Sequence, residues 1–353
     1  MIKLFKNKIS IFLIITVMFL LIVSVGNCEV KYQFNAAGVN PIWGETGIIL
    51  QSFASSVRYA TGGEVDIKIF AGGEWGGSEE EYCQSVQFGT LDIATPATAP
   101  ISQYTNALSM FDTPFLFLST FDELLLTFDS TTSYTPIVAK KLEQASKESK
   151  FMVLAVAPLG RRNINSNKPI GTIADLKGVK IRVMNNPIQV DTFNFMGASA
   201  TPMPFSELFT ALQLKAVDAM EGPPIDYVME KFYEVAPHTV VTDHLTLAQT
   251  IIMSMKAWDS LPSAYQNIVR DCAIGAAHTA SLWGSGSYEY YLGSSIPKLA
   301  KSVTRISLEE KAELRAMVLP KLLDKYSEQI GIDVLEGIAE GDEVITDWLA
   351  KNK

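Results

Sequence analysis

Short strand patterns alternate with helical patterns along the chain, and this alternation constrains the fold more than any other feature. In the segment 65–70, apolar residues at odd positions alternate with Asp66 and Lys68, as in a strand. The segment 41–59 has the apolar spacing of a helix, and Ser78, followed by three glutamates, begins another helix. Such alternation predicts a largely parallel sheet with helices on both faces.

The second half of the chain continues this pattern and requires more than one domain. Strands are predicted at 151–157 and 179–183, and helices at 205–214 and 261–292. The Pro-Leu-Gly sequence at 158–160 marks a crossing to a second lobe. About 325 residues remain after the N-terminal leader, a length that suits two domains.

The first 28 residues have the composition of an export signal. Three lysines precede an apolar stretch at 9–25, and small residues then lead to Cys28. We interpret residues 1–28 as a cleaved signal peptide and expect a periplasmic protein. An uncleaved membrane anchor is the alternative, although the stretch is short for a bilayer span of about 20 residues. Lipid attachment at Cys28 is a third interpretation, which the neighbouring Asn27 disfavours.

Charge and cysteine content narrow the classes of partner. Loss of the leader removes three lysines and no acids, which takes the formal net charge from −9 to −12. A surface this acidic repels nucleic acid and anionic lipid, so we expect neither as a partner. An anionic ligand must then be held by local charges inside a cleft, screened from the surface over about 8 Å. Cys83 and Cys272 are expected to be free, buried thiols, with a disulfide between them as the alternative.

Two arginines lie where predicted strands end. Arg182 lies near the carboxyl end of the strand 179–183, at the edge that faces the ligand crevice in open α/β sheets. Arg162 follows the strand 151–157. A guanidinium presents a planar fork that matches a carboxylate with two parallel hydrogen bonds. Spacing alone leaves open the alternative that both arginines pair with acids between the lobes.

Several motifs resemble those of the substrate-binding proteins of TRAP transporters, the family typified by C4-dicarboxylate and sialic acid binders. The matches occur in order over about three quarters of the chain. The strongest blocks read GRRNINSNKPI at 160–170, DLKGVKIRV at 175–183, GASATPMPFSEL at 197–208 and LQLKAVDAMEGP at 212–223. Shorter matches are GTLD at 89–92 and TPFLF at 113–117.

The resemblance implies an α/β periplasmic binding protein of the Venus-flytrap type. Its two lobes would be joined by crossing strands and by the long helix at 261–292. The expected boundaries place lobe I at 29–158 plus 248–286 and lobe II at 159–247 plus 287–353.

The same resemblance implies roles for individual residues. Arg182 matches the arginine that grips the substrate carboxylate, and Arg162 matches a second arginine that assists it. Phe205 matches a residue that packs against the ligand. The other polar residues expected at the site are Asn35 and Glu79 in the first lobe, Asn185 and Asn186 after the gripping strand, and Glu221. From its residue type, Trp43 is also expected to line the cleft, with a core position as the alternative.

Two positions depart from the sialic acid binders. Ala97 stands where those proteins have an acid, and Gly222 stands where many relatives have asparagine. Both changes remove polar side chains. We therefore expect a ligand other than sialic acid, with a smaller hydrogen-bonding pattern or with apolar atoms in the vacated space.

The function that follows is capture of a ligand, without catalysis. We expect a monomeric binding protein without a cofactor that delivers a small organic anion to the membrane subunits of a TRAP transporter. A periplasmic sensor of a signalling receptor, with the same binding chemistry, is the alternative. The histidines and cysteines lack the spacing of metal ligands, and no nucleophile or acid–base pair has the spacing of a hydrolase.

Overall fold

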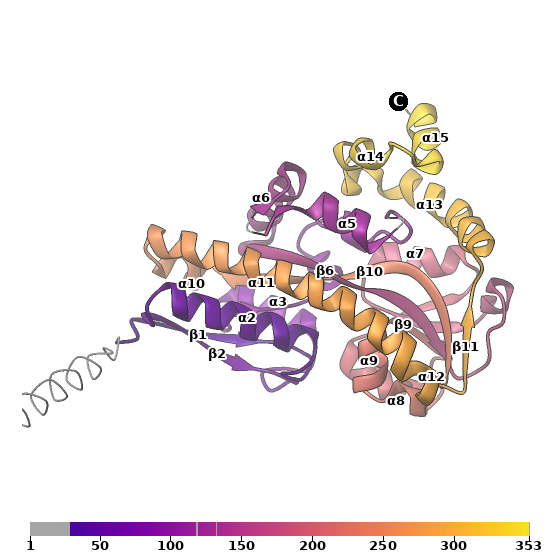
Figure 1. Cartoon of the computed structure of the whole chain (residues 1–353), viewed down its shortest axis with the longest axis horizontal. Coiled ribbons are helices and arrows are strands. Elements are labelled where there is room, and N and C mark those ends of the chain that lie inside the picture. Colours follow the sequence, from indigo (N-terminus) through magenta and orange to yellow (C-terminus); the bar gives the residue numbers. More distant parts are fainter. Residues whose placement is uncertain (1–28, 118, 132, 353) are drawn as a thin grey trace, which may run out of the picture.

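The computed structural model describes residues 29–353 except 118, 132 and 353 (Figure 1). The predicted signal peptide at 1–28, with its alternatives of a membrane anchor or a lipid attached at Cys28, lies outside the described residues. Within the described part, nine strands form one sheet in the order β2-β1-β3-β10-β6-β9-β7-β8, with β11 beside β10, and β4 pairs with β5.

The strands are β1 (Tyr32–Ala37), β2 (Val65–Phe70), β3 (Ile93–Ala94), β4 (Phe128–Ser130), β5 (Ser133–Tyr134), β6 (Phe151–Ser166), β7 (Lys180–Val183), β8 (Ser199–Pro202), β9 (Ala219–Gly222), β10 (His238–Ser254) and β11 (Ser302–Arg305). The α-helices are α2 (Glu45–Ala60), α3 (Glu79–Phe88), α4 (Thr98–Ile101), α5 (Thr120–Thr127), α6 (Pro136–Ser149), α7 (Pro187–Phe195), α8 (Phe205–Gln213), α9 (Pro224–Met229), α10 (Met255–Ser260), α11 (Ser263–Tyr290), α12 (Ile296–Leu299), α13 (Leu308–Ile330), α14 (Ile332–Ile338) and α15 (Glu343–Asn352). Short 3-10 turns lie at η1 (Ser109–Asp112), η2 (Ile173–Leu176) and η3 (Phe232–Glu234), and a π-helical turn lies at η4 (Tyr291–Ser295).

Two long antiparallel strands, β6 and β10, run through the centre of the sheet. On one side of this pair β1 joins β2 and β3 in parallel, and on the other side β7 joins β8 and β9 in parallel. The parallel order predicted from the sequence is therefore present on each side, while the strands that join the two sides are antiparallel. We call β1–β3 with α2 and α3 the first lobe (residues 32–94), and β7–β9 with α7, α8 and α9 the second lobe (residues 180–229).

The strand β6 continues through the Pro-Leu-Gly sequence at 158–160, beyond its predicted end. Pro158 lies opposite Ala248 of β10, next to a shift in register between Thr246 and Ala248. A β-bulge at this point tolerates a proline, which has no N–H to give to the ladder. The predicted crossing between lobes is thus a continuous strand. The lobe boundaries assigned from the sequence stay a prediction.

The helix α11 is the longest in the described chain and lies across both lobes (Figure 1). It packs against α2 and β6 and also reaches α9. Its close approach to β6 depends on Gly284, because a Cβ atom there would lie 2.8 Å from the Cα atom of Leu159. The long helical tract predicted at 261–292 is confirmed, with α-helical bounds of Ser263–Tyr290.

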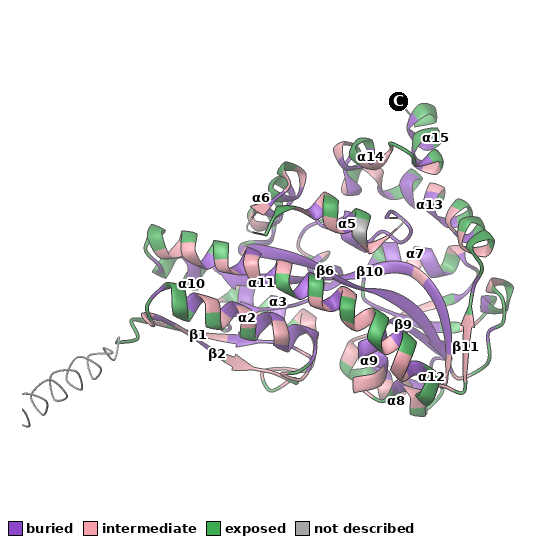
Figure 2. Ribbon diagram, viewed as in Figure 1, coloured by how far each residue is buried: buried purple, intermediate pink, exposed green. Residues whose placement is uncertain are grey.

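Buried residues concentrate along β6, β10 and the inward faces of the helices (Figure 2). A separate small core lies beneath α8 and α9, built on Leu208, Leu212 and Tyr227. The helix α13 packs on α7 and η1. It begins with the predicted capping box, in which the Ser307 and Glu310 side chains accept each other's backbone N–H.

Candidate ligand-binding site

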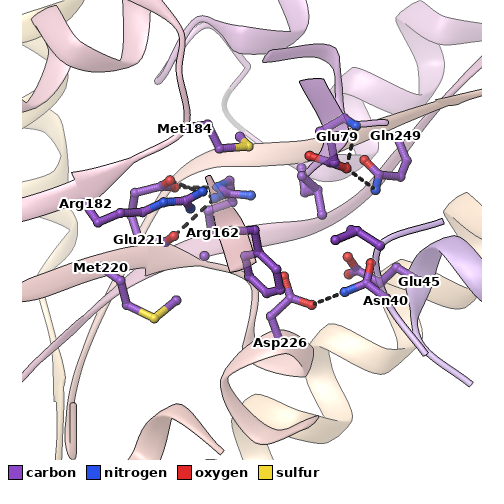
Figure 3. A pocket seen from close by; sticks show the side chains of 15 residues that line it. Asn40, Glu45, Glu79, Arg162, Arg182, Met184, Met220, Glu221, Asp226 and Gln249 are labelled. Atoms are coloured by element: carbon purple, nitrogen blue, oxygen red, sulfur yellow. Dashed lines mark hydrogen bonds and ion pairs between the residues drawn. The ribbon is translucent and has the colours of Figure 1, made fainter. Parts of the chain in front are cut away.

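A small cavity lies between the two lobes, beside β6 and β10, and has a volume of about 30 Å³. The cavity is small because the lobes stand close together. Both lobes and both crossing strands contribute to its walls (Figure 3). The lining residues are Val39, Asn40, Glu45, Glu79, Ala97, Arg162, Arg182, Met184, Phe205, Met220, Glu221, Gly222, Asp226, Leu247 and Gln249.

Arg182 projects from β7 into this cavity and is 3% exposed. Its Nε and Nη2 donate to the backbone oxygen of Met203, at 3.1 and 2.9 Å, and its guanidinium carbon lies 5.9 Å from the centre of the Phe205 ring. No carboxylate of the described residues lies within ion-pair distance of it. Burial lowers the pKa of Arg182 to about 10, although Glu221 partly offsets this effect. The side chain is still a cation at neutral pH, and its hydrogen bonds to the described residues use only Nε and Nη2.

Arg162 is held differently, by a bidentate ion pair with Glu221. Its Nη2 donates to Glu221 Oε1 at 2.7 Å, and its Nε donates to Oε2 of the same carboxylate. Both side chains are buried, and His244 Nε2 lies 3.6 Å from Glu221 Oε2. Burial opposes ionisation of Glu221, but Arg162 and His244 together hold its pKa well below the usual range. The alternative that the arginines are structural and pair with acids therefore holds for Arg162 and does not hold for Arg182 among the described residues.

Glu79 forms the first-lobe wall at the N-terminus of α3. Its Oε1 accepts hydrogen bonds from the Ala97 backbone N–H at 3.0 Å and from Gln249 Nε2 at 3.4 Å. Burial raises the pKa of Glu79 to about 7, with these hydrogen bonds opposing the shift. Ala97, which stands in place of an acid, thus contributes its backbone to the site.

Four further polar residues at the site were not identified from the sequence: Asn40, Glu45, Asp226 and Gln249. Asn40 Nδ2 donates to Asp226 Oδ1 at 3.2 Å, which links the first lobe directly to the second. Glu45 is the first residue of α2, and Asp226 lies in the first turn of α9. A helix that begins at the cleft directs its first turn toward the ligand, and this signal could have found Glu45 and Asp226.

Four expected site residues are not among the described residues that line the cavity. Asn35 lies in β1, where its backbone N–H donates to Asp92, and Trp43 is 63% exposed. Asn185 is exposed, and Asn186 is the buried N-cap of α7, whose Nδ2 donates to Asp112 Oδ2 at 3.1 Å. Their contact with a ligand stays a prediction.

Gly222 lines the cavity, as the resemblance implied, and the space beside it is filled by a neighbour. A Cβ atom at Gly222 would lie 3.0 Å from the Cε atom of Met220. The expected loss of polar side chains therefore applies only to the wall around Gly222. Asn40, Asp226 and Gln249 bring polar groups to the cavity from other elements.

The remaining predictions concern the cysteines, metal ligands and membrane-spanning helices. Cys83 and Cys272 are free, as expected; Cys83 is buried as predicted, but the prediction that Cys272 is buried is wrong, because this residue is partly exposed. Among the described residues, no three histidine, cysteine, aspartate or glutamate side chains gather as a metal site requires. No helix in the described part of the chain is long and apolar enough to span a bilayer.

Two α/β lobes, crossing strands and a polar cavity between them define a two-lobed ligand-binding protein. The chain belongs to the bacterial extracellular solute-binding proteins, family 7, whose model matches residues 45–329. It is a TRAP periplasmic solute-binding protein, which confirms the resemblance noted in the sequence. The family consists of binding proteins and not of enzymes. A solute-binding protein of Verminephrobacter eiseniae is 30% identical over 294 residues, which cover 83% of this chain and 84% of that protein.

Solved structures show the same fold. A TRAP periplasmic solute-binding protein from Desulfovibrio salexigens with bound orotic acid has a TM-score of 0.78 and 30% sequence identity, and the match covers 90% of this chain and 100% of that chain. A sugar acid binding protein from Advenella mimigardefordensis in complex with galactonate has a TM-score of 0.76 and 28% identity, over 91% of this chain and 100% of that chain. These similarities confirm the predicted α/β periplasmic binding protein fold.

Proposed function

We propose that this protein captures a small organic acid by its carboxylate and that Arg182 is the residue that grips it. The observation that carries the proposal is the state of this one side chain. Arg182 is a buried cation in the wall of the cavity. Its hydrogen-bond partner is a backbone carbonyl, which does not neutralise its charge as an acid would. A buried charge without a counter-ion is costly. A ligand carboxylate supplies the missing negative charge.

The hydrogen bonds of Arg182 leave one edge of the guanidinium for the ligand. Nε and one Nη2 hydrogen point to Met203 O, which fixes the plane of the group. Nη1 and the second Nη2 hydrogen then form an end-on fork for two carboxylate oxygens. Phe205 covers the guanidinium, and its ring gives an apolar surface to the body of the ligand.

Closure of the lobes would be linked to this ligand. Asn40 and Asp226 join the lobes in the closed arrangement, and a ligand that contacts Arg182 and the first lobe adds to those contacts. Because such a ligand binds the closed form better than an open one, it shifts the population toward closure. The closed complex would then be delivered to the membrane subunits of the transporter. Support from relatives is chemical: orotic acid and galactonate, bound to two of them, are both carboxylates.

Two substitutions at Arg182 test the grip, after a thermal-shift screen has identified a bound organic acid. Each charge-assisted hydrogen bond contributes about 1.5–3 kcal/mol. Arg182→Ala should therefore lose about 3–6 kcal/mol, or roughly 10²- to 10⁴-fold in Kd by calorimetry. Arg182→Lys keeps the charge and loses the fork, so its loss should be smaller. The matched control is Arg305→Ala on the exposed end of β11. Wild-type affinity in Arg182→Ala would refute the proposal.

A further inference from the structure

The end of the cavity away from the two arginines is acidic. Figure 3 shows Arg182, Arg162 and Glu221 at one end, and Glu45, Asn40 and Asp226 together at the other. Glu45 is 2% exposed and Asp226 is 9% exposed, and they come from opposite lobes. Two carboxylates thus approach each other across the cleft in a dry environment.

Glu45 is also incompletely satisfied. Its Oε2 is buried and has no hydrogen-bond partner among the described atoms, although the side chain lines the cavity. Asp226 has Asn40 as a hydrogen-bond donor, and no ion pair to it is formed by the described residues. A buried acceptor without a donor calls for a physical explanation, and at a binding cavity a donor atom of the ligand can supply the missing hydrogen bond.

The charges of the cavity indicate which atom is missing. Arg162 and Glu221 neutralise each other; Arg182, Glu45, Glu79 and Asp226 also line the cavity, and among the described residues none of these three acids is within ion-pair distance of Arg182. A simple carboxylate ligand would neutralise Arg182 and leave all three acids without a cation. The position of Glu45 in the first turn of α2 favours its charged form, while its burial and the nearby Asp226 oppose that form.

We propose that the ligand is an organic acid that also carries an amine, whose ammonium group lies between Glu45 and Asp226. This inference rests on the proposed carboxylate grip of Arg182 and adds the chemical class at the other end of the ligand. An ammonium group has three donors and one positive charge, so it can satisfy Glu45 Oε2 and separate the two acids. A hydroxyl group has one donor and no charge, and would leave the repulsion in place.

The alternative way to relieve this repulsion is uptake of a proton on closure. Glu45 faces Asp226, Arg162 and Glu79, and Asp226 faces Arg162, Glu230 and Arg182. Burial raises the pKa of both acids, that of Asp226 to about 7. An acid without an amine would therefore bind together with a proton. An amino acid would bring the positive charge itself and would bind with less or no proton uptake.

Matched pairs of ligands separate these two cases. The probes are gluconate and glucosaminate, lactate and alanine, and gamma-hydroxybutyrate and gamma-aminobutyrate, which differ within each pair by a hydroxyl or an amine. Calorimetry on the full mature chain in two buffers of different ionisation enthalpy gives both the Kd and the number of protons taken up. In at least one pair the amine should bind about tenfold or more tightly than its hydroxyl partner, as expected for one charge-assisted hydrogen bond in a buried site.

Conservative variants test whether Glu45 and Asp226 cause the preference for the amine over the hydroxyl ligand. Glu45→Gln and Asp226→Asn keep shape and remove charge, and each should reduce the ratio of amine to hydroxyl affinity about tenfold. Glu74→Gln, on the exposed loop before α3, is the matched control and should leave the ratio unchanged.

The outcomes distinguish this inference from the carboxylate grip on which it rests. If hydroxyl acids bind as tightly as their amine partners, or if the preference survives both variants, the ammonium site is wrong and the grip stands. Equal proton uptake by both members of a pair would likewise exclude the ammonium site. If Arg182→Ala binds every acid as the wild type does, the grip is wrong and this inference falls with it. Failure of all three amines to bind also overturns the ammonium site.

Discussion

Removal of the charge on Glu221 should destabilise the fold strongly. Arg162 and Glu221 are 3% and 1% exposed, and two side-chain hydrogen bonds join them. Loss of one partner of a buried ion pair costs about 3–5 kcal/mol, because the remaining charge stays buried without compensation. Two charge-assisted bonds at about 1.5–3 kcal/mol each give a similar value. Glu221→Gln should therefore lower the unfolding free energy by about 3–5 kcal/mol, which corresponds to a fall in Tm of roughly 4–7 °C for a chain of this size.

Urea and thermal unfolding followed by circular dichroism measure this effect. The pKa of Glu221 in the folded chain is held below its ordinary value of 4.5, so its contribution is complete above pH 4.5 and declines as the pH falls through the folded pKa. The difference between Glu221→Gln and the wild type should shrink in the same direction. Glu143→Gln, which breaks the exposed pair with Lys147, is the control and should leave the midpoint unchanged.

A double variant tests whether the uncompensated buried charge causes the destabilisation. Arg162→Met with Glu221→Met removes both charges and fills similar volume, so it should be more stable than Glu221→Gln alone. The reasoning would be refuted if Glu221→Gln unfolds within about 1 kcal/mol of the wild type, or if the double variant is the least stable of the set.

Two further predictions concern packing and pH. Gly284→Ala would place a Cβ atom 2.8 Å from Leu159, so it should destabilise the chain by about 1–3 kcal/mol in urea unfolding. Gly286→Ala in the same helix has open space and should be neutral or stabilising by up to about 1 kcal/mol; equal effects of the two substitutions would contradict the close-packing argument. Burial raises the pKa of Glu79 to about 7, so the folded chain holds that proton more strongly and stability should fall as the pH rises from 4.5 to about 7. Glu79→Gln should reduce this fall in unfolding measured across that range, and an unchanged pH profile would count against the burial of this carboxyl.

Local sequence patterns predict most elements of the fold. The strand at 65–70, the helix that begins after Ser78 and the capping box before α13 follow from alternation and from residues that satisfy backbone N–H groups at a helix start. These signals are local, because each depends on neighbours within one or two turns. The helix α2 begins at Glu45, later than the predicted start at 41, with Gly44 as its N-cap.

The central strands show what a local pattern cannot determine. The sequence pattern predicts β10 neither as a strand nor as the partner of β6, because both of its faces are covered and its sequence lacks alternation. The predicted end of β6 lies near Pro158, where a bulge in β6 itself allows the pairing with β10 to continue. Pairing of strands about 90 residues apart is a tertiary event.

The sequence by itself determined the class of fold, the family and the presence of Arg182, Arg162, Glu79, Phe205 and Glu221 at one cavity. Only the tertiary structure decided how these charges are distributed. It pairs Arg162 with Glu221, gives Arg182 no ion pair with an acid in the described part of the chain, and brings Glu45 and Asp226 together from opposite lobes. The physical reason is that the state of a charge depends on burial and on partners distant in the chain, and neither is encoded in local spacing.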